Sequence, residues 1–131
     1  MKLKELIKAQ DSLTNLADIR LSSAKDNYNV FKLYKQVKEE ISNYDAQRNK
    51  IIMEYGEKNS EGNVSVRRSN PNFSKAVKDI AELEDLDIDI NFNKISVKPD
   101  ELKLSAIDIY NLESFGILEV IENGDTANIG N

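Results

Sequence analysis

The fold of this chain is decided by residues 23–55, which read SAKDNYNVFKLYKQVKEEISNYDAQRNKIIMEY. Apolar and aromatic side chains recur here in alternating steps of four and three, the heptad spacing of a helix that packs against another helix. Ser23 is suited to cap the first turn, and Gly56 to leave the last turn in a left-handed conformation. We therefore predict one long helix that ends near Tyr55. Its heptad positions are Val30, Tyr34, Val37, Ile41, Tyr44, Arg48, Ile51 and Tyr55.

The segment before this helix carries a helical pattern of its own. Apolar residues gather into one stripe on a helix from about residue 4 to about residue 19. A break at residues 22–26 separates the two helices, so we expect them to form an antiparallel hairpin. The stripe contains Leu3, Leu6, Ile7, Leu13, Leu16 and Ile19.

The second half of the chain mixes helix and strand signals. Asn70-Pro71 resembles a helix opening, and the following apolar face predicts a third helix of about twelve residues. Residues 86–92 alternate between apolar and polar side chains, which predicts a half-buried strand whose hairpin partner is residues 95–97. Val64 and Val66 are compatible with a further short strand, and a short helix should begin near Ser105.

Together these patterns predict an α+β fold in a single domain, residues 1–118. It contains an N-terminal antiparallel helical hairpin with one long helix, a third helix, a small antiparallel β-sheet and a short C-terminal helix. Residues 119–131 are expected to form a partly disordered C-terminal tail.

The charges are distributed unevenly along the 131 residues. Residues 1–80 carry 15 Lys and Arg against 11 Asp and Glu, whereas residues 81–131 carry 3 against 12. Such asymmetry favours electrostatic matching with another macromolecule. The chain has neither Cys nor His, which removes thiolate nucleophiles, Cys-ligated zinc and the usual general base. We therefore expect no enzyme activity, no cofactor and no bound metal.

The acidic run at residues 82–89 is the first candidate site. It places five carboxylates in eight residues: Glu82, Glu84, Asp85, Asp87 and Asp89. A calcium loop opening at Asp85 would need Gly and Glu where the chain has Ile90 and Ser96, so that motif fails. The simplest interpretation is the solvent side of a strand. The functional alternative is a surface that docks a protein partner.

The tyrosines of the long helix are the second candidate site. Tyr34, Tyr44 and Tyr55 lie on its heptad stripe, where tyrosine most often packs in or beside a core. The alternative is an exposed interface, because tyrosine anchors protein contacts at small entropic cost. A partner helix or a second copy in a homo-oligomer would then cover the stripe. The best basic cluster, at residues 67–78, is too small to outweigh an acidic chain, which argues against nucleic acid.

Four stretches carry a resemblance to known proteins: LKELIKAQDSLTNL, RNKIIMEYGEKNSEGN, KDIAELEDLDIDI and DELKLSAIDIYNLESFGIL. Over residues 1–118 the chain resembles a small uncharacterised protein family of siphophages and prophages of Gram-positive bacteria. The resemblance implies a phage origin and synthesis in the host bacterial cytoplasm, with genes among late structural and lysis genes. It carries over no catalytic residues.

We accordingly expect a non-enzymatic phage accessory protein that acts by protein-protein interaction, in virion assembly. Its partner would be a phage or host protein. No apolar stretch approaches the ~20 residues that a membrane-spanning helix needs, so no membrane contact is expected. The alternative is a phage-encoded inhibitor of a host antiviral defence system or nuclease, acting through its acidic C-terminal half.

Overall fold

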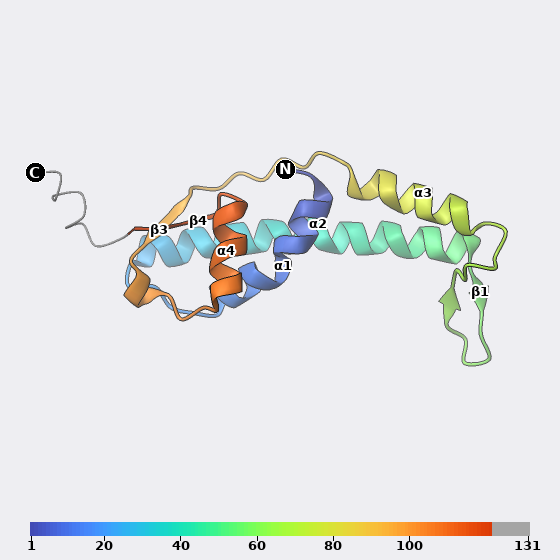
Figure 1. Ribbon diagram of the computed structural model, residues 1–131, viewed down its shortest axis with the longest axis horizontal. Helices are drawn as coiled ribbons and strands as arrows, with labels where there is room; N and C mark the ends of the chain where they lie inside the picture. The colour runs from blue at the N-terminus through green and yellow to red at the C-terminus, as the bar shows by residue number, and fades with distance from the viewer. Residues whose placement is uncertain (122–131) are drawn as a thin grey trace, which may run out of the picture.

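The computed structural model describes residues 1–121 and shows a mixed α+β fold built on one long helix (Figure 1). The predicted fold class, with its long helix, third helix, small antiparallel sheet and short C-terminal helix, is confirmed. The elements in chain order are α1 (Leu3–Ala17), α2 (Ala24–Tyr55), β1 (Glu57–Lys58), β2 (Val64–Ser65), α3 (Phe73–Glu84), β3 (Ile95–Val97), the short helix η1 (Pro99–Glu101), α4 (Ala106–Ser114) and β4 (Leu118–Val120).

Helix α2 is the longest helix described, and α1, α3, β2 and β3 all pack against it. Its 32 residues span about 48 Å at the usual helical rise. It begins where predicted, because the Ser23 hydroxyl accepts a hydrogen bond from the Asp26 amide at 3.2 Å. Helix α1 lies obliquely across the N-terminal half of α2, and α3 runs back along its C-terminal half (Figure 1). The predicted packing of the first two helices is confirmed, but the distal heptads face α3.

Helix α2 ends at Tyr55 as predicted, although for a different reason. Gly56 has a φ of −88°, so the predicted left-handed exit is wrong. A Cβ added at Gly56 would lie 2.5 Å from the Ile52 carbonyl oxygen and 2.6 Å from a methyl carbon of Val64. Glycine is therefore required because the β1–β2 hairpin folds back closely onto the end of the helix.

The apolar core lies at one end of the molecule. It is formed by α1, the N-terminal half of α2, α4 and the β3–β4 pair, and Leu16 and Leu112 at its centre are 0% exposed. The largest fully buried side chains are Leu6, Leu13, Leu16, Leu21, Leu33, Val37, Ile95, Leu112 and Ile117. Core positions on α2 run from Val30 to Tyr44, so the core ends about two thirds of the way along that helix.

The strands form two separate pairs. Strands β1 and β2 are antiparallel, with Glu57 opposite Ser65. Strands β3 and β4 are parallel, with Ile95 opposite Leu118. The predicted hairpin between residues 86–92 and residues 95–97 is therefore wrong. A parallel partner requires a crossover, and η1 with α4 supplies it.

Residues 86–94 are extended, but other parts of the chain take their backbone hydrogen bonds. The Leu3 amide donates to the Leu86 carbonyl oxygen at 2.9 Å, and the Ile88 amide donates to that of Met1 at 2.8 Å. Further along, the side-chain amide of Gln36 donates to the Asn91 carbonyl at 2.7 Å and accepts from the Asn91 amide at 3.1 Å. With these groups bonded, the segment does not form a strand with residues 95–97.

The predicted alternation of side chains along this segment holds in part. Ile88, Ile90 and Phe92 pack against the core, half-buried, while the side chains between them face outward. Leu86 departs from the pattern, because its side chain is 51% exposed.

Strand β4 carries the fold past the domain boundary predicted at residue 118. Residues 122–131, the rest of the predicted tail, lie outside the described residues.

Candidate protein-binding surface

The acidic run is partly neutralised inside the fold. The Asp85 carboxylate lies 2.7 Å from the Lys2 ammonium and 3.4 Å from that of Lys4. Hydrogen bonds from these two lysines hold the pKa of Asp85 below its ordinary value. The Glu84 carboxylate accepts a hydrogen bond from the Tyr44 hydroxyl at 2.5 Å. Two of the five predicted carboxylates therefore fasten this segment to α1 and α2.

The other three carboxylates remain on the surface. Glu82, Asp87 and Asp89 are exposed and form no ion pair within residues 1–121. In the same part of the chain, no group of three or more acidic side chains is arranged to hold a metal ion.

The three tyrosines of the predicted stripe have two different environments in the structure. Tyr44 is 8% exposed, and burial together with its bond to Glu84 raises the pKa of its hydroxyl to about 12. The Tyr55 hydroxyl donates to the Asp79 carboxylate at 3.0 Å, which raises the pKa of Tyr55. Both tyrosines therefore hold α3 on α2. Tyr34, which is half-buried, instead lines a groove between α1 and α2.

Two aromatic side chains are exposed one turn apart near the start of α2. Tyr28 is 61% exposed and Phe31 is 55% exposed, with ring centroids 6.3 Å apart. The Lys32 ammonium lies 5.7 Å from the Tyr28 ring centroid, within the range of a cation–π contact. Lys35 borders the same shallow depression. We call Tyr28, Phe31, Lys32 and Lys35 the aromatic–basic surface.

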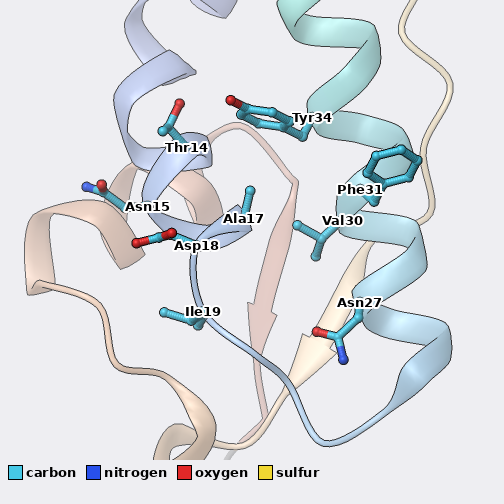
Figure 2. A pocket seen from close by; sticks show the side chains of 9 residues that line it. All are labelled: Thr14, Asn15, Ala17, Asp18, Ile19, Asn27, Val30, Phe31 and Tyr34. Carbon is cyan, nitrogen blue, oxygen red and sulfur yellow. The ribbon is translucent and has the colours of Figure 1, made fainter.

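A groove of about 560 Å³ opens beside this surface, between the C-terminal end of α1 and the N-terminal half of α2 (Figure 2). Figure 2 shows Tyr34 reaching from α2 toward Thr14 on α1, with Val30 deeper between the helices. Phe31 lines both this groove and the depression beside Tyr28, so it stands on the ridge between two concavities. The groove is lined by Thr14, Asn15, Ala17, Asp18, Ile19, Asn27, Val30, Phe31 and Tyr34.

A polar cluster fastens α4 to α1 behind the groove. The Asp108 carboxylate accepts hydrogen bonds from the Ser12 hydroxyl at 2.8 Å and the Asn15 side-chain amide at 2.9 Å. Burial opposes ionisation of Asp108, but the bonds from Asn15, Ser12 and Ser105 outweigh it and hold its pKa below the ordinary value. Ser12 is only 2% exposed, so its hydroxyl is closed to a substrate and serves packing.

The aromatic–basic surface was not singled out by the heptad analysis. Tyr28 and Phe31 lie off the stripe on which that analysis depends, and Phe31 directly follows the buried Val30. The available signal was the presence of two large aromatic residues at a spacing of three on the polar side of an amphipathic helix.

Within residues 1–121, no helix combines the length and the apolar character needed to cross a membrane. Comparisons with protein-family models, with curated proteins and with solved structures find no match to the chain.

Proposed function

We propose that this chain is a non-enzymatic accessory protein that binds another protein through the aromatic–basic surface and the adjoining groove. Given the resemblance to phage proteins, we place this role in virion assembly in the host bacterial cytoplasm. The observation that carries the proposal is the exposure of Tyr28 and Phe31, at 61% and 55%, beside one depression, with Phe31 also lining the adjoining groove.

Aromatic residues contribute disproportionately to protein interfaces because each covers a large area with few rotatable bonds. Scattered apolar residues on a surface need no explanation, but here two exposed rings line one shallow depression, and Phe31 also lines the adjoining groove. Covering most of the exposed area of a single such ring contributes on the order of 1–2 kcal/mol to binding. Phe31 touches both concavities, so we expect it to be the principal anchor.

The charges around the rings indicate what the partner offers. Lys32, Lys35 and Lys38 form no ion pair among the described residues, although Lys38 lies 5.5 Å from the Tyr34 ring centroid. Glu39 lines the depression and Asp18 lines the groove, so a matching partner segment places its apolar side chain in the groove and its carboxylates beside the lysines of α2. The proposed partner is therefore a phage or host protein that presents an acidic, amphipathic segment.

The test is affinity capture of the tagged chain from phage-infected cells, compared with its Phe31→Ala variant. Met53→Ala is the matched control, because Met53 lies on the same helix, is 61% exposed and borders neither concavity. We expect one protein to co-purify with the wild-type and Met53→Ala chains and to be lost with Phe31→Ala. An identical set of proteins from all three baits would refute the proposed surface.

A second candidate function is inhibition of a host nuclease or defence protein through the acidic segment. The observation in its favour is that Asp87 and Asp89 are exposed on the same side of an extended strand-like segment. Reversing both charges to lysine should abolish such binding and its salt dependence, whereas capture that depends on Phe31 should persist.

A further inference from the structure

The last third of α2, which extends beyond the core, forms an arm with almost no interior together with the elements that pack on it. We define the distal arm as residues 45–84, which contain the end of α2, the β1–β2 hairpin and α3; Figure 1 shows it projecting away from α1, α4 and the β3–β4 pair. Among its apolar side chains only Ala76 is buried, whereas every other buried apolar side chain described lies outside it. A two-stranded hairpin and a single helix pair bury too little on their own to be well stabilised.

One face of the distal arm carries an apolar groove of about 300 Å³ between α2, β2 and α3. Val77 at its edge is 49% exposed, and Phe73, Ile80 and Ile52 are half-buried. Arg48, the polar residue on the predicted heptad stripe, borders the same groove. The groove is lined by Arg48, Ile52, Val64, Ser65, Val66, Phe73, Ala76, Val77 and Ile80. Within residues 1–121 the mouth of this groove is open to solvent, and Val77 at its edge is the most exposed apolar side chain that lines it.

The charges of the distal arm favour one kind of occupant. Residues 45–84 carry 7 Lys and Arg and 7 Asp and Glu, so the arm is neutral, while the rest of the chain carries 11 against 16. An arm with no net charge, whose groove is lined by one charged side chain, Arg48, offers little attraction to a nucleic acid or to a strongly charged peptide. The distal arm is suited to pack against the distal arm of a second copy. Two identical arms that meet around a two-fold axis carry the same net charge, so a net charge would make them repel each other.

We propose that the distal arms of two copies pack against each other around a two-fold axis. The α2–α3 pair of each copy would join the other in a four-helix bundle, with the apolar groove closed between them. Within each copy, the hydrogen bonds from Tyr44 to Glu84 and from Tyr55 to Asp79 already fix α3 on α2. The interface therefore forms between prearranged helix pairs. It lies apart from the aromatic–basic surface, so either surface can be tested without the other.

The experiment is sedimentation velocity on the full chain over a concentration series, with Val77→Lys as the disrupting variant. Met53→Lys is the matched control, since it makes the same change at a 61% exposed site in the same arm that does not line the groove. We expect the wild-type and Met53→Lys chains to shift to the dimer mass as concentration rises. Val77→Lys should keep the monomer mass with an unchanged helical circular dichroism spectrum.

Val77→Ala is a second disrupting variant, for the case in which Val77→Lys does not fold. Alanine favours helix and introduces no charge, so this variant should keep the fold. We expect it to raise the dimer dissociation constant by about tenfold. A wild-type chain that stays monomeric at every concentration would overturn the proposal. Dimerisation of Val77→Ala and Val77→Lys as tight as that of the wild type would overturn it equally.

Discussion

The polar cluster around Asp108 should be the most important non-apolar contribution to the stability of this fold. Asp108→Ala removes two hydrogen bonds to a carboxylate, each contributing about 1 kcal/mol at this partly exposed site. It also takes away the acceptor of the Ser12 hydroxyl, which is 2% exposed, at a cost of about 1 kcal/mol more. We expect the free energy of unfolding to fall by about 3 kcal/mol, or roughly 10 °C in Tm.

Urea denaturation followed by circular dichroism measures this loss. Glu113→Ala is the control, because Glu113 lies on the same helix, is exposed and makes no side-chain hydrogen bond among the described residues. It should change stability by no more than about 0.5 kcal/mol. A double-mutant cycle with Ser12→Ala should give a coupling energy of about 1 kcal/mol. Equal losses for Asp108→Ala and Glu113→Ala would refute the role given to the cluster.

The difference in free energy of unfolding between the wild-type and Asp108→Ala chains should depend on pH, because the pKa of Asp108 is lowered in the folded state. Because its pKa is lower in the folded state than in the unfolded state, its contribution is fully present above its ordinary value of 3.8. The contribution is lost as the pH falls through the folded pKa. The gap between the wild-type and Asp108→Ala chains should therefore narrow below pH 3.8, which denaturation at a series of acidic pH values measures.

Three further outcomes follow from the packing of α2. Gly56→Ala should lower the free energy of unfolding by about 2 kcal/mol, measured by urea denaturation, because its Cβ would lie 2.5 Å from a backbone oxygen. Gln36→Ala should speed hydrogen exchange at the Asn91 amide, because the side chain that accepts its hydrogen bond at 3.1 Å is gone. Tyr44→Phe should flatten the alkaline loss of stability, measured by urea denaturation at a series of alkaline pH values. Burial and the bond to Glu84 raise the folded pKa of Tyr44, so its protonated hydroxyl stabilises the fold fully below pH 10.0 and this effect is lost as the pH rises through about 12.

Each of these changes has a neighbour that serves as its control. Ser60→Ala alters the exposed hairpin tip without a clash and should leave the unfolding energy unchanged. Gln47→Ala alters an exposed glutamine of the same helix and should not affect exchange at Asn91. Tyr28→Phe removes a hydroxyl that is exposed with its ring and should keep the wild-type alkaline profile. A control that behaves like its test variant would contradict the corresponding contact.

The helices were predictable because their signals are local. The length of α3 and the start of α4 follow from local patterns, and the Ser105 hydroxyl does accept from the Asp108 amide at 3.1 Å. The predicted opening of α3 at Asn70-Pro71 is wrong, because the helix begins at Phe73 and its N-cap Asn72 makes no side-chain cap hydrogen bond. Side-chain direction along residues 86–92 was also largely predictable, since alternation needs no knowledge of a partner. These features depend on neighbours within a few residues.

The pairing of residues 86–92 was not predictable, because it depends on residues that are distant in the sequence. A period of two says which face is buried but not which chain segment takes the backbone hydrogen bonds. Here two of the partners are Met1 and Leu3, which are more than eighty residues away in sequence. The third partner is the side chain of Gln36, which bonds to the backbone of Asn91 where a neighbouring strand would otherwise do so. A nearby hairpin was the expected solution, and long-range contacts displaced it.

Long-range contacts also pair part of the basic half of the chain with the acidic half. The acidic run was one of two candidate docking surfaces in the sequence, yet Lys2 and Lys4 from the basic half contact Asp85, and Tyr44 contacts Glu84. Part of the segregated charge thus joins the two halves of one fold, which leaves fewer free carboxylates than the count of acidic residues suggests. The lysines of α2, by contrast, keep no ion pair within residues 1–121 and surround exposed rings. We therefore propose that the partner binds to that helix and not to the acidic segment.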